Sequence, residues 1–216
     1  MTARQMNKSK DKYYKYRDFS DIEHLMDILL EERLYCATLE QLNDPMEGHL
    51  RYSKLKENRK KEMIKELNNY FICSLSKKHN KGLMWTHYAN SHQGICIALN
   101  VTSKVWEHGE INYVKSMPSV DNYSKCTPED YVKDVLTKKS EDWQYEEEVR
   151  WIRRKGKGRY LKIHITDIYL GMKIPYEKEL FIRKLIKFLN IFRKKSNKNL
   201  IAIHKMTEKE IDFGFH

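Results

Sequence analysis

Short runs of alternating or β-branched apolar residues predict strands along most of the chain. These runs occupy residues 13–19, 33–38, 70–76, 94–100, 110–114, 148–154, 159–165, 167–174 and 199–206. Polar or turn-forming residues separate the runs, as they separate the strands of an antiparallel or mixed sheet. The glycine-containing turn at 155–158 further predicts that the strands on either side of it form a hairpin.

Helical periodicity occurs between these strands. Apolar residues at positions i, i+3, i+4, i+7 and i+8 fill residues 22–30, and Ser20 with Glu23 predicts a capping box before them. Other helices are expected over 53–69, 83–92 (helix or loop), Pro128 to about Lys139 and 176–195. Short strands interspersed with helices predict the α+β class, with a curved mixed or antiparallel sheet and surrounding helices. We expect a disordered leader at residues 1–12 and a single domain over 13–216.

Composition narrows the class of protein. The 216 residues suffice for one hydrophobic core. No apolar run approaches about 18 residues and the polar start lacks the core of a secretion signal, so we expect no membrane association. None of the four cysteines forms a C-x-x-C pair, and three lie in strand-like runs: Cys36, Cys73 and Cys96, with Cys126 outside them. Reduced thiols in a cytoplasmic protein are the simplest interpretation.

The net charge of +11 is distributed unevenly. From Arg150 onward there are 18 lysines and arginines against 6 acidic residues, whereas residues 1–149 hold 23 against 24. A concentrated basic face attracts nucleic-acid phosphates by releasing counterions, although such an excess can also serve solubility alone. The side chains expected to contact nucleic acid are Arg150, Arg153, Arg154, Lys155, Lys157 and Arg159.

Three adjacent glutamates stand where a strand is predicted to begin. Alternation along a strand would place Glu146 and Glu148 on one face and Glu147 on the other. Two carboxylates on one face could perform acid–base chemistry or hold ribose hydroxyls. They could also bind Mg²⁺, or form a solvated patch that pairs with the neighbouring arginines.

Two strand motifs add polar groups to this picture. Arg17 follows Tyr16 in the first predicted strand, and its planar guanidinium suits a phosphate, although an edge-strand ion pair explains it equally well. Ser74 and Ser76 share one face of a later strand. They lack the G-x-S-x-G elbow of serine hydrolases, so they are expected to bond the backbone or a ligand.

The segment 83–92 is rich in aromatic residues. Trp85, His87 and Tyr88 could line a nucleotide pocket by stacking and hydrogen bonding, and a core-filling helix is the alternative. His87 and His92 are five residues apart, which does not align two ligands on one helix face. With no C-x-x-C or H-E-x-x-H present, we expect no metal site.

The order of these segments resembles the bacterial family known as domain of unknown function 2971. The resemblance covers roughly residues 13–174 and is most specific in MWTHYANSHQGICI (84–97) and WQYEEEVR (143–150). It implies no function by itself. Three motifs also resemble the arginine–serine–glutamate class of ADP-ribosyltransferases, in the same order: Tyr16-Arg17, Ser74-Leu75-Ser76 and Glu146-Glu147-Glu148-Val149.

This second resemblance implies an ADP-ribosyltransferase-like fold and an enzyme that uses NAD as a substrate. Glu148 would stabilise the positive charge that develops on the ribose, and Glu146 would orient or deprotonate the acceptor. The dinucleotide would be held by Tyr16, Arg17, Ser74, Ser76, Trp85, His87 and Tyr88.

The acceptor would be nucleic acid, DNA or RNA, or a protein associated with it. A role as a toxin or in bacterial antiviral defence is suggested only by association with small basic proteins of this kind, and no residue chemistry indicates it. Two other functions stay open, a metal-dependent nuclease and a non-enzymatic nucleic-acid-binding module. The sequence predicts no particular protein partner or inhibitor.

Overall fold

The computed structural model describes residues 11–44, 57–116, 127–156 and 158–214. They form an α+β fold with a mostly antiparallel sheet and surrounding helices, as expected. The strands are β1 (Tyr13–Arg17), β2 (Arg33–Tyr35), β3 (Tyr70–Ser76), β4 (Ile95–Val101), β5 (Glu107–Glu110), β6 (Asn112–Val114), β7 (Lys138–Ser140), β8 (Glu148–Arg154), β9 (Tyr160–Leu170) and β10 (Ala202–Lys205). The helices are α1 (Ile22–Glu31), α2 (Glu57–Leu67), α3 (Gly82–Tyr88), α4 (Pro128–Leu136) and α5 (Tyr176–Lys195), with 3-10 turns at η1 (Leu39–Gln41), η3 (Glu141–Glu146) and η4 (Glu208–Glu210).

The described residues build a main sheet with the strand order β10-β9-β4-β1-β3-β8-β5, and β2 pairs with β9 off this path. The pairs along this order are antiparallel, except that β9 and β10 are parallel. The predicted hairpin across residues 155–158 is wrong, because β8 pairs with β3 and β5 while β9 pairs with β4, β10 and β2. A turn signal is local, whereas the partner of a strand depends on the apolar surface that the pairing buries.

Three other predicted helix or strand boundaries also differ from the structure. Helix α4 ends at Leu136 rather than near Lys139, because residues 138–140 pair with β6 as strand β7. The predicted strand 110–114 divides into β5 and β6, which pair with different partners. The runs predicted at 159–165 and 167–174 join into one continuous strand, β9, which ends at Leu170, so residues 171–174 lie outside it.

Helix α1 keeps its predicted periodicity but not its predicted cap. Leu25, Ile28 and Leu29 are buried in the core. The Oδ1 atom of Asp21 accepts the hydrogen bond from the His24 amide at 3.0 Å, which caps the helix. The predicted capping box at Ser20 is therefore wrong, since the Ser20 hydroxyl donates to Asp18 instead.

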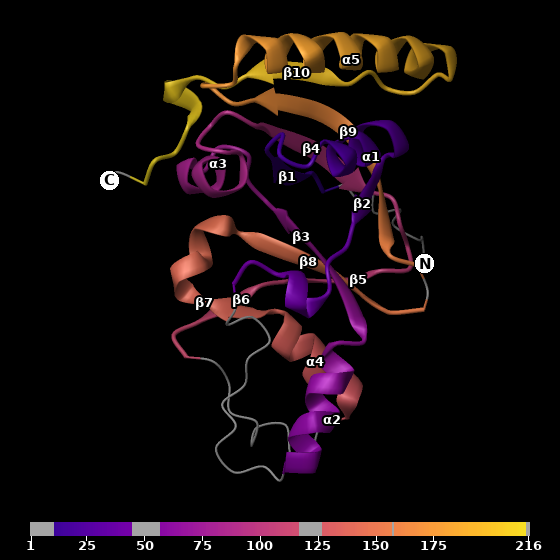
Figure 1. Cartoon of the computed structure of the whole chain (residues 1–216), viewed down its shortest axis with the longest axis vertical. Helices are drawn as coiled ribbons and strands as arrows, with labels where there is room; N and C mark the ends of the chain where they lie inside the picture. Colours follow the sequence, from indigo (N-terminus) through magenta and orange to yellow (C-terminus); the bar gives the residue numbers. More distant parts are fainter. Residues whose placement is uncertain (1–10, 45–56, 117–126, 157, 215–216) are drawn as a thin grey trace, which may run out of the picture.

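Helix α5 and the pair α2–α4 lie at opposite ends of the molecule, with α1 and α3 between them (Figure 1). Helix α5 lies along β10 at one end and buries Ile182 and Ile186 in the main core. Helices α2 and α4 lie together at the other end, where Met63 and Val132 belong to one buried cluster. The sheet between these two ends carries the predicted site residues of β1, β3 and β8.

The main sheet opens between two of its central strands. Among the described residues, β1 and β3 pair at one position, Tyr14 with Ser76. By contrast, β1 pairs with β4 at five positions and β3 pairs with β8 at seven. Beyond the Tyr14–Ser76 pair the two strands diverge, and the side chains between them line a pocket.

Three predicted features concern the whole chain. Cys36, Cys73 and Cys96 are buried free thiols, and Cys126 lies outside the described residues. None of the helices in the described ranges is long and apolar enough to cross a bilayer. The predicted leader falls mainly on residues 1–10, also outside the description, while Lys12 forms an ion pair with Asp167 at 2.9 Å.

Candidate functional site

The pocket where the sheet opens, called here the β1–β3 pocket, has a volume of about 410 Å³. Side chains from β1, β3 and α3 line it, together with Lys139, Glu146 and Glu148. Its size falls within the range of pockets that enclose small-molecule ligands. One wall is basic and the other carries the two glutamates.

The basic wall comes from β1, where Lys15 and Arg17 are two residues apart and share one face. The Lys15 ammonium donates to the Ser74 carbonyl at 2.9 Å, and burial beside Arg17 lowers the pKa of Lys15. Burial also lowers the pKa of Arg17, whose Nε is enclosed without a hydrogen-bond partner among the described residues. A buried donor without an acceptor is costly, so this wall suits an anionic ligand.

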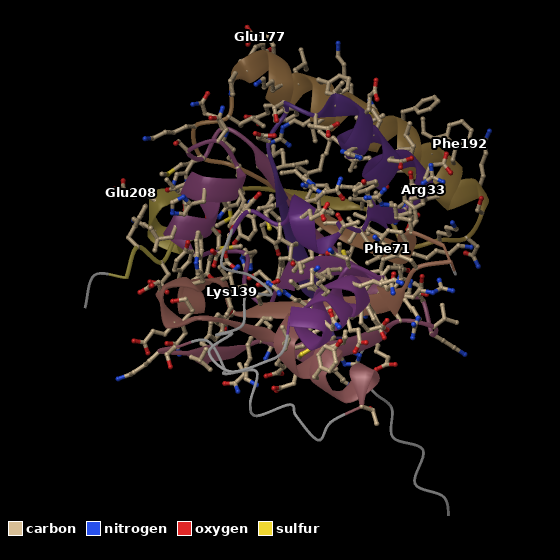
Figure 2. All side chains as sticks on the ribbon, turned by 60° about the horizontal axis from the view of Figure 1, so that its bottom comes forward. Arg33, Phe71, Lys139, Glu177, Phe192 and Glu208 are labelled. Carbon is tan, nitrogen blue, oxygen red and sulfur yellow. The ribbon has the colours of Figure 1, made fainter. Side chains whose placement is uncertain are left out.

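The acidic wall is buried rather than solvated. Glu146 and Glu148 are each 4% exposed, so the alternative of a solvated acidic patch does not hold. The Lys139 ammonium lies between them, 2.6 Å from Glu146 Oε2 and 3.2 Å from Glu148 Oε2. Figure 2 labels Lys139, which lies well away from Phe192 on α5. The ammonium compensates part of the repulsion between the two carboxylates.

The two carboxylates have different surroundings and therefore different proton affinities. The Arg150 Nε donates to Glu148 Oε1 at 2.7 Å. Burial alone would raise the pKa of Glu148, but Arg150, Lys139 and a hydrogen bond from Ser74 lower it to about 2. Burial raises the pKa of Glu146, although Lys139 opposes this, and the Tyr88 hydroxyl donates to Glu146 Oε1 at 2.6 Å.

This difference divides the chemistry between the two residues. Glu148 stays ionised throughout the neutral and weakly acidic range, so it can stabilise positive charge but is a poor base. Glu146 binds a proton more readily and is the better candidate for proton transfer. Paired carboxylates whose pKa values are driven apart commonly take the two roles of acid–base chemistry.

Glu147 lies outside this pocket, as expected, but strand alternation is not the reason. Residues 141–146 form the turn η3, Glu147 has a left-handed conformation with φ of 43°, and β8 begins at Glu148. The Glu147 carboxylate lies 3.5 Å from the Lys81 ammonium and is absent from the pocket lining. A left-handed turn therefore brings the two flanking carboxylates to the same pocket.

The remaining predicted pocket residues divide into two groups. Tyr16, Ser74, Ser76, His87 and Tyr88 line the β1–β3 pocket together with Arg17. The Ser76 hydroxyl donates to the Glu146 carbonyl at 2.7 Å, which fixes the turn before β8. Trp85 does not line the pocket: it is fully buried, and its Nε1 donates to the His79 carbonyl. Trp85 thus has the core-filling role that the sequence left open.

The residues expected to contact nucleic acid do not form one face. Arg150 is 1% exposed and binds Glu148, so it is a buried ion-pair partner of that carboxylate and does not itself line the pocket. Arg153 is half-buried beside the Trp106 ring, and Arg154 pairs with Glu66. The side chain of Lys155 is exposed, Arg159 donates to Gln41 and the Cys36 carbonyl, and Lys157 lies outside the described residues.

Sequence reasoning did not assign three cations to this site. Lys139 was expected at a helix end, and Arg150 was expected on the surface. Lys15 had a detectable signal, because it precedes Arg17 by two residues in a predicted strand and must share its face. Arg150 had the same signal, because it follows Glu148 by two residues and pairing of the glutamates with neighbouring arginines was an open alternative, whereas no signal along the chain predicts the contact of Lys139 with Glu148.

The chain was compared with protein-family models, curated proteins and solved structures, and none of them matches it. Within the described ranges, no group of three or more histidine, cysteine, aspartate or glutamate side chains is arranged to hold a metal ion.

Proposed function

We propose that the β1–β3 pocket binds NAD and that the protein transfers ADP-ribose from it to an acceptor, as an ADP-ribosyltransferase-like enzyme. The observation that carries this proposal is the convergence of Arg17, Ser74, Ser76, Glu146 and Glu148 on one pocket, with Glu147 outside it. Three short motifs far apart in the sequence thus meet at a single site.

The charges of the pocket suit the two ends of a dinucleotide. The phosphates would lie against Lys15 and Arg17, where the buried Arg17 Nε lacks an acceptor among the described residues. A ribose hydroxyl would donate to Glu148 in exchange for one of the hydrogen bonds that this carboxylate accepts from Arg150, Lys139 and Ser74. His87 is exposed and Tyr88 half-buried at the same pocket, so either ring can pack against a base or the nicotinamide.

The proposed reaction breaks the bond between the ribose carbon and the nicotinamide nitrogen. Nicotinamide leaves with the bonding electron pair, and positive charge develops on the sugar. The ionised Glu148 carboxylate stabilises that charge because it is fixed in a water-poor site. Glu146 accepts the proton that the acceptor loses as its new bond to the ribose forms.

A nucleic acid or a nucleic-acid-associated protein is proposed as the acceptor, on the basis of the basic C-terminal third. The metal-dependent nuclease is the weaker alternative. The Lys139 ammonium lies within 3.2 Å of an oxygen of each glutamate, where a bridging Mg²⁺ would have to bind.

Labelled NAD incubated with separate pools of DNA, RNA and protein tests the proposal. We expect label on one pool with the wild-type protein, and loss of at least about 100-fold in rate for Glu148→Gln, since removing an electrostatic stabiliser commonly costs this much. Glu147→Gln is the matched control, because it makes the same chemical change one residue away and outside the pocket.

Two results would remove the proposal. One is that the wild-type protein consumes no NAD, whether DNA, RNA, protein or water is offered as the acceptor. The other is that folded Glu148→Gln protein retains the wild-type rate. Circular dichroism of each variant establishes that it is folded before its rate is interpreted.

A further inference from the structure

Two thiols of the main core face each other beside β3. Ala37 and Ile72 form an antiparallel bridge in which each amide donates to the other residue's carbonyl at 2.8 Å. Cys36 and Cys73 lie one position further along the bridge, so the antiparallel register places them directly opposite each other. At such a position the side chains point to the same face and the Cα atoms are about 4.5 Å apart. A disulfide requires a Cα separation of about 4.4–6.8 Å, so the backbone suits one.

The two thiols are reduced in the structure and differ in access. Cys73 is 2% exposed, but it lines the β1–β3 pocket. Cys36 is fully buried and absent from the pocket lining. A small oxidant that enters the pocket can therefore reach Cys73, whereas Cys36 is reached only through the Cys73 sulfur.

Two cations face the Cys73 thiol. The β1–β3 register places Lys15 and Arg17 on the same face of the sheet as Cys73. Burial lowers the pKa of both cations, and Cys73 is the strongest of the negative charges that oppose this effect. A hydrogen bond from the Cys36 thiol contributes most to lowering the pKa of Cys73, the two cations add to it, and burial opposes them. The Cys73 sulfur thus becomes a nucleophilic thiolate more readily than an ordinary buried thiol.

Cys96 shows the ordinary behaviour of a buried thiol. It is fully buried in a different cluster and does not line the β1–β3 pocket. Burial raises the pKa of Cys96 well above its usual value, so this thiol acts as a small apolar side chain. The contrast indicates that Cys36 and Cys73 do more than fill space.

We propose that Cys36 and Cys73 form a redox site that a peroxide oxidises to a disulfide, with Cys73 as the nucleophile and Cys36 as the resolving thiol. The Cys73 thiolate attacks one peroxide oxygen: the S–O bond forms, the O–O bond breaks, and the leaving oxygen takes back the proton that ionisation of Cys73 released to water. The Cys36 thiol then loses its proton and attacks the Cys73 sulfur, so the S–S bond forms and hydroxide leaves with that proton as water. The sulfurs are oxidised in a two-electron couple, and the peroxide is reduced to water or an alcohol.

Oxidation also changes the β1–β3 pocket. A disulfide carries no charge, so closing the bond removes the anion that opposes Lys15 and Arg17. The basic wall of the pocket then becomes more positive. This redox site goes beyond the proposed transfer of ADP-ribose and does not depend on it.

Peptide mapping of the folded protein after peroxide treatment tests the inference. A Cys126→Ser background leaves Cys36, Cys73 and Cys96 as the thiols. With hydrogen peroxide we expect a cross-linked Cys36–Cys73 peptide that forms at least about tenfold faster than any oxidation of Cys96 and that dithiothreitol reduces again. In Cys36→Ala a dione probe for sulfenic acid should label Cys73, whereas Cys73→Ala should leave Cys36 unlabelled.

Lys15→Met tests the contribution of the basic wall. The rate of disulfide formation should fall at least about threefold, because this cation lowers the pKa of Cys73. Lys12→Met is the matched control. It removes the same charge from an exposed side chain that pairs with Asp167, so its rate should stay within about twofold of wild type.

Folded wild-type protein that forms no Cys36–Cys73 link would overturn the inference. Oxidation of Cys96 as fast as Cys73 would overturn it too, because that rate would reflect opening of the whole core. A sulfenic acid on Cys36 in the Cys73→Ala variant would have the same consequence, as would equal slowing by the two lysine variants.

Two features keep the test independent. If Cys36→Ala fails to fold, the comparison of Cys73 with Cys96 in the wild-type fold still decides the outcome. The oxidation assay contains no NAD, so a missing disulfide leaves the proposed function standing. Likewise, wild-type protein that consumes no NAD but forms the disulfide removes only the proposed function.

Discussion

Replacing Glu148 by glutamine should change how acid affects the free energy of unfolding. The carboxylate is 4% exposed and lies between the Arg150 guanidinium and the Lys139 ammonium. Its pKa is about 2 in the folded protein. The pKa of an unperturbed glutamate is about 4.3. The folded protein therefore stabilises the ionised form of Glu148 relative to its protonated form.

The sign and size of the effect follow from this difference. Because the folded pKa is lower, the carboxylate stabilises the protein above about pH 4.3 and loses that contribution as pH falls toward 2. A difference of about two units is worth about 3 kcal/mol at pH 7, of which roughly half is lost by pH 3. Glu146 acts in the opposite sense, since burial raises its pKa.

Urea unfolding followed by tryptophan fluorescence at pH 7, 5 and 3 measures the effect. Between pH 7 and pH 3, Glu148→Gln should lose about 1–2 kcal/mol less than the wild-type protein, because the titrating group is absent. Glu147→Gln, half-exposed beside Lys81, should follow the wild-type profile. A Glu148→Gln profile that parallels wild type would refute the assignment of the low pKa to this residue.

Four other outcomes are expected. Arg17→Met should weaken NAD binding in calorimetry by about 10- to 100-fold without lowering the melting temperature, because the lost contacts are with the ligand; unchanged affinity contradicts this. Tyr88→Phe should cost about 1 kcal/mol in urea unfolding, since it removes the hydrogen bond to Glu146. Trp85→Ala should cost about 3–5 kcal/mol while the milder Trp85→Phe leaves the NAD affinity within about twofold, because Trp85 fills the core. A chelator should leave the transfer rate unchanged, because Lys139 already compensates the carboxylates; abolished activity would favour the nuclease.

Local patterns in the sequence predicted the elements better than their pairing. The periodicity of residues 176–195 gave the whole of α5, and the apolar run at 70–76 gave β3. The partner of β8 could not be read from the turn at 155–158. A local turn does not determine which distant strands form hydrogen bonds with β9.

The candidate site was predictable in its residue types and not in its surroundings. The strand period placed Ser74 and Ser76 together, and both line the β1–β3 pocket. Glu146 and Glu148 share this pocket through the left-handed Glu147, a conformation that the sequence did not indicate. Lys139 and Arg150 lie within nine residues of the glutamates, but their ion pairs depend on the turn η3 and on burial, so the pKa difference between the glutamates required the structure.

The most direct test of the account is a crystal structure of the protein with bound NAD. The account predicts one dinucleotide in the β1–β3 pocket, with a phosphate oxygen within hydrogen-bonding distance of Arg17 and a ribose hydroxyl within hydrogen-bonding distance of Glu148. A dinucleotide bound elsewhere, or one that contacts neither side chain, would contradict it.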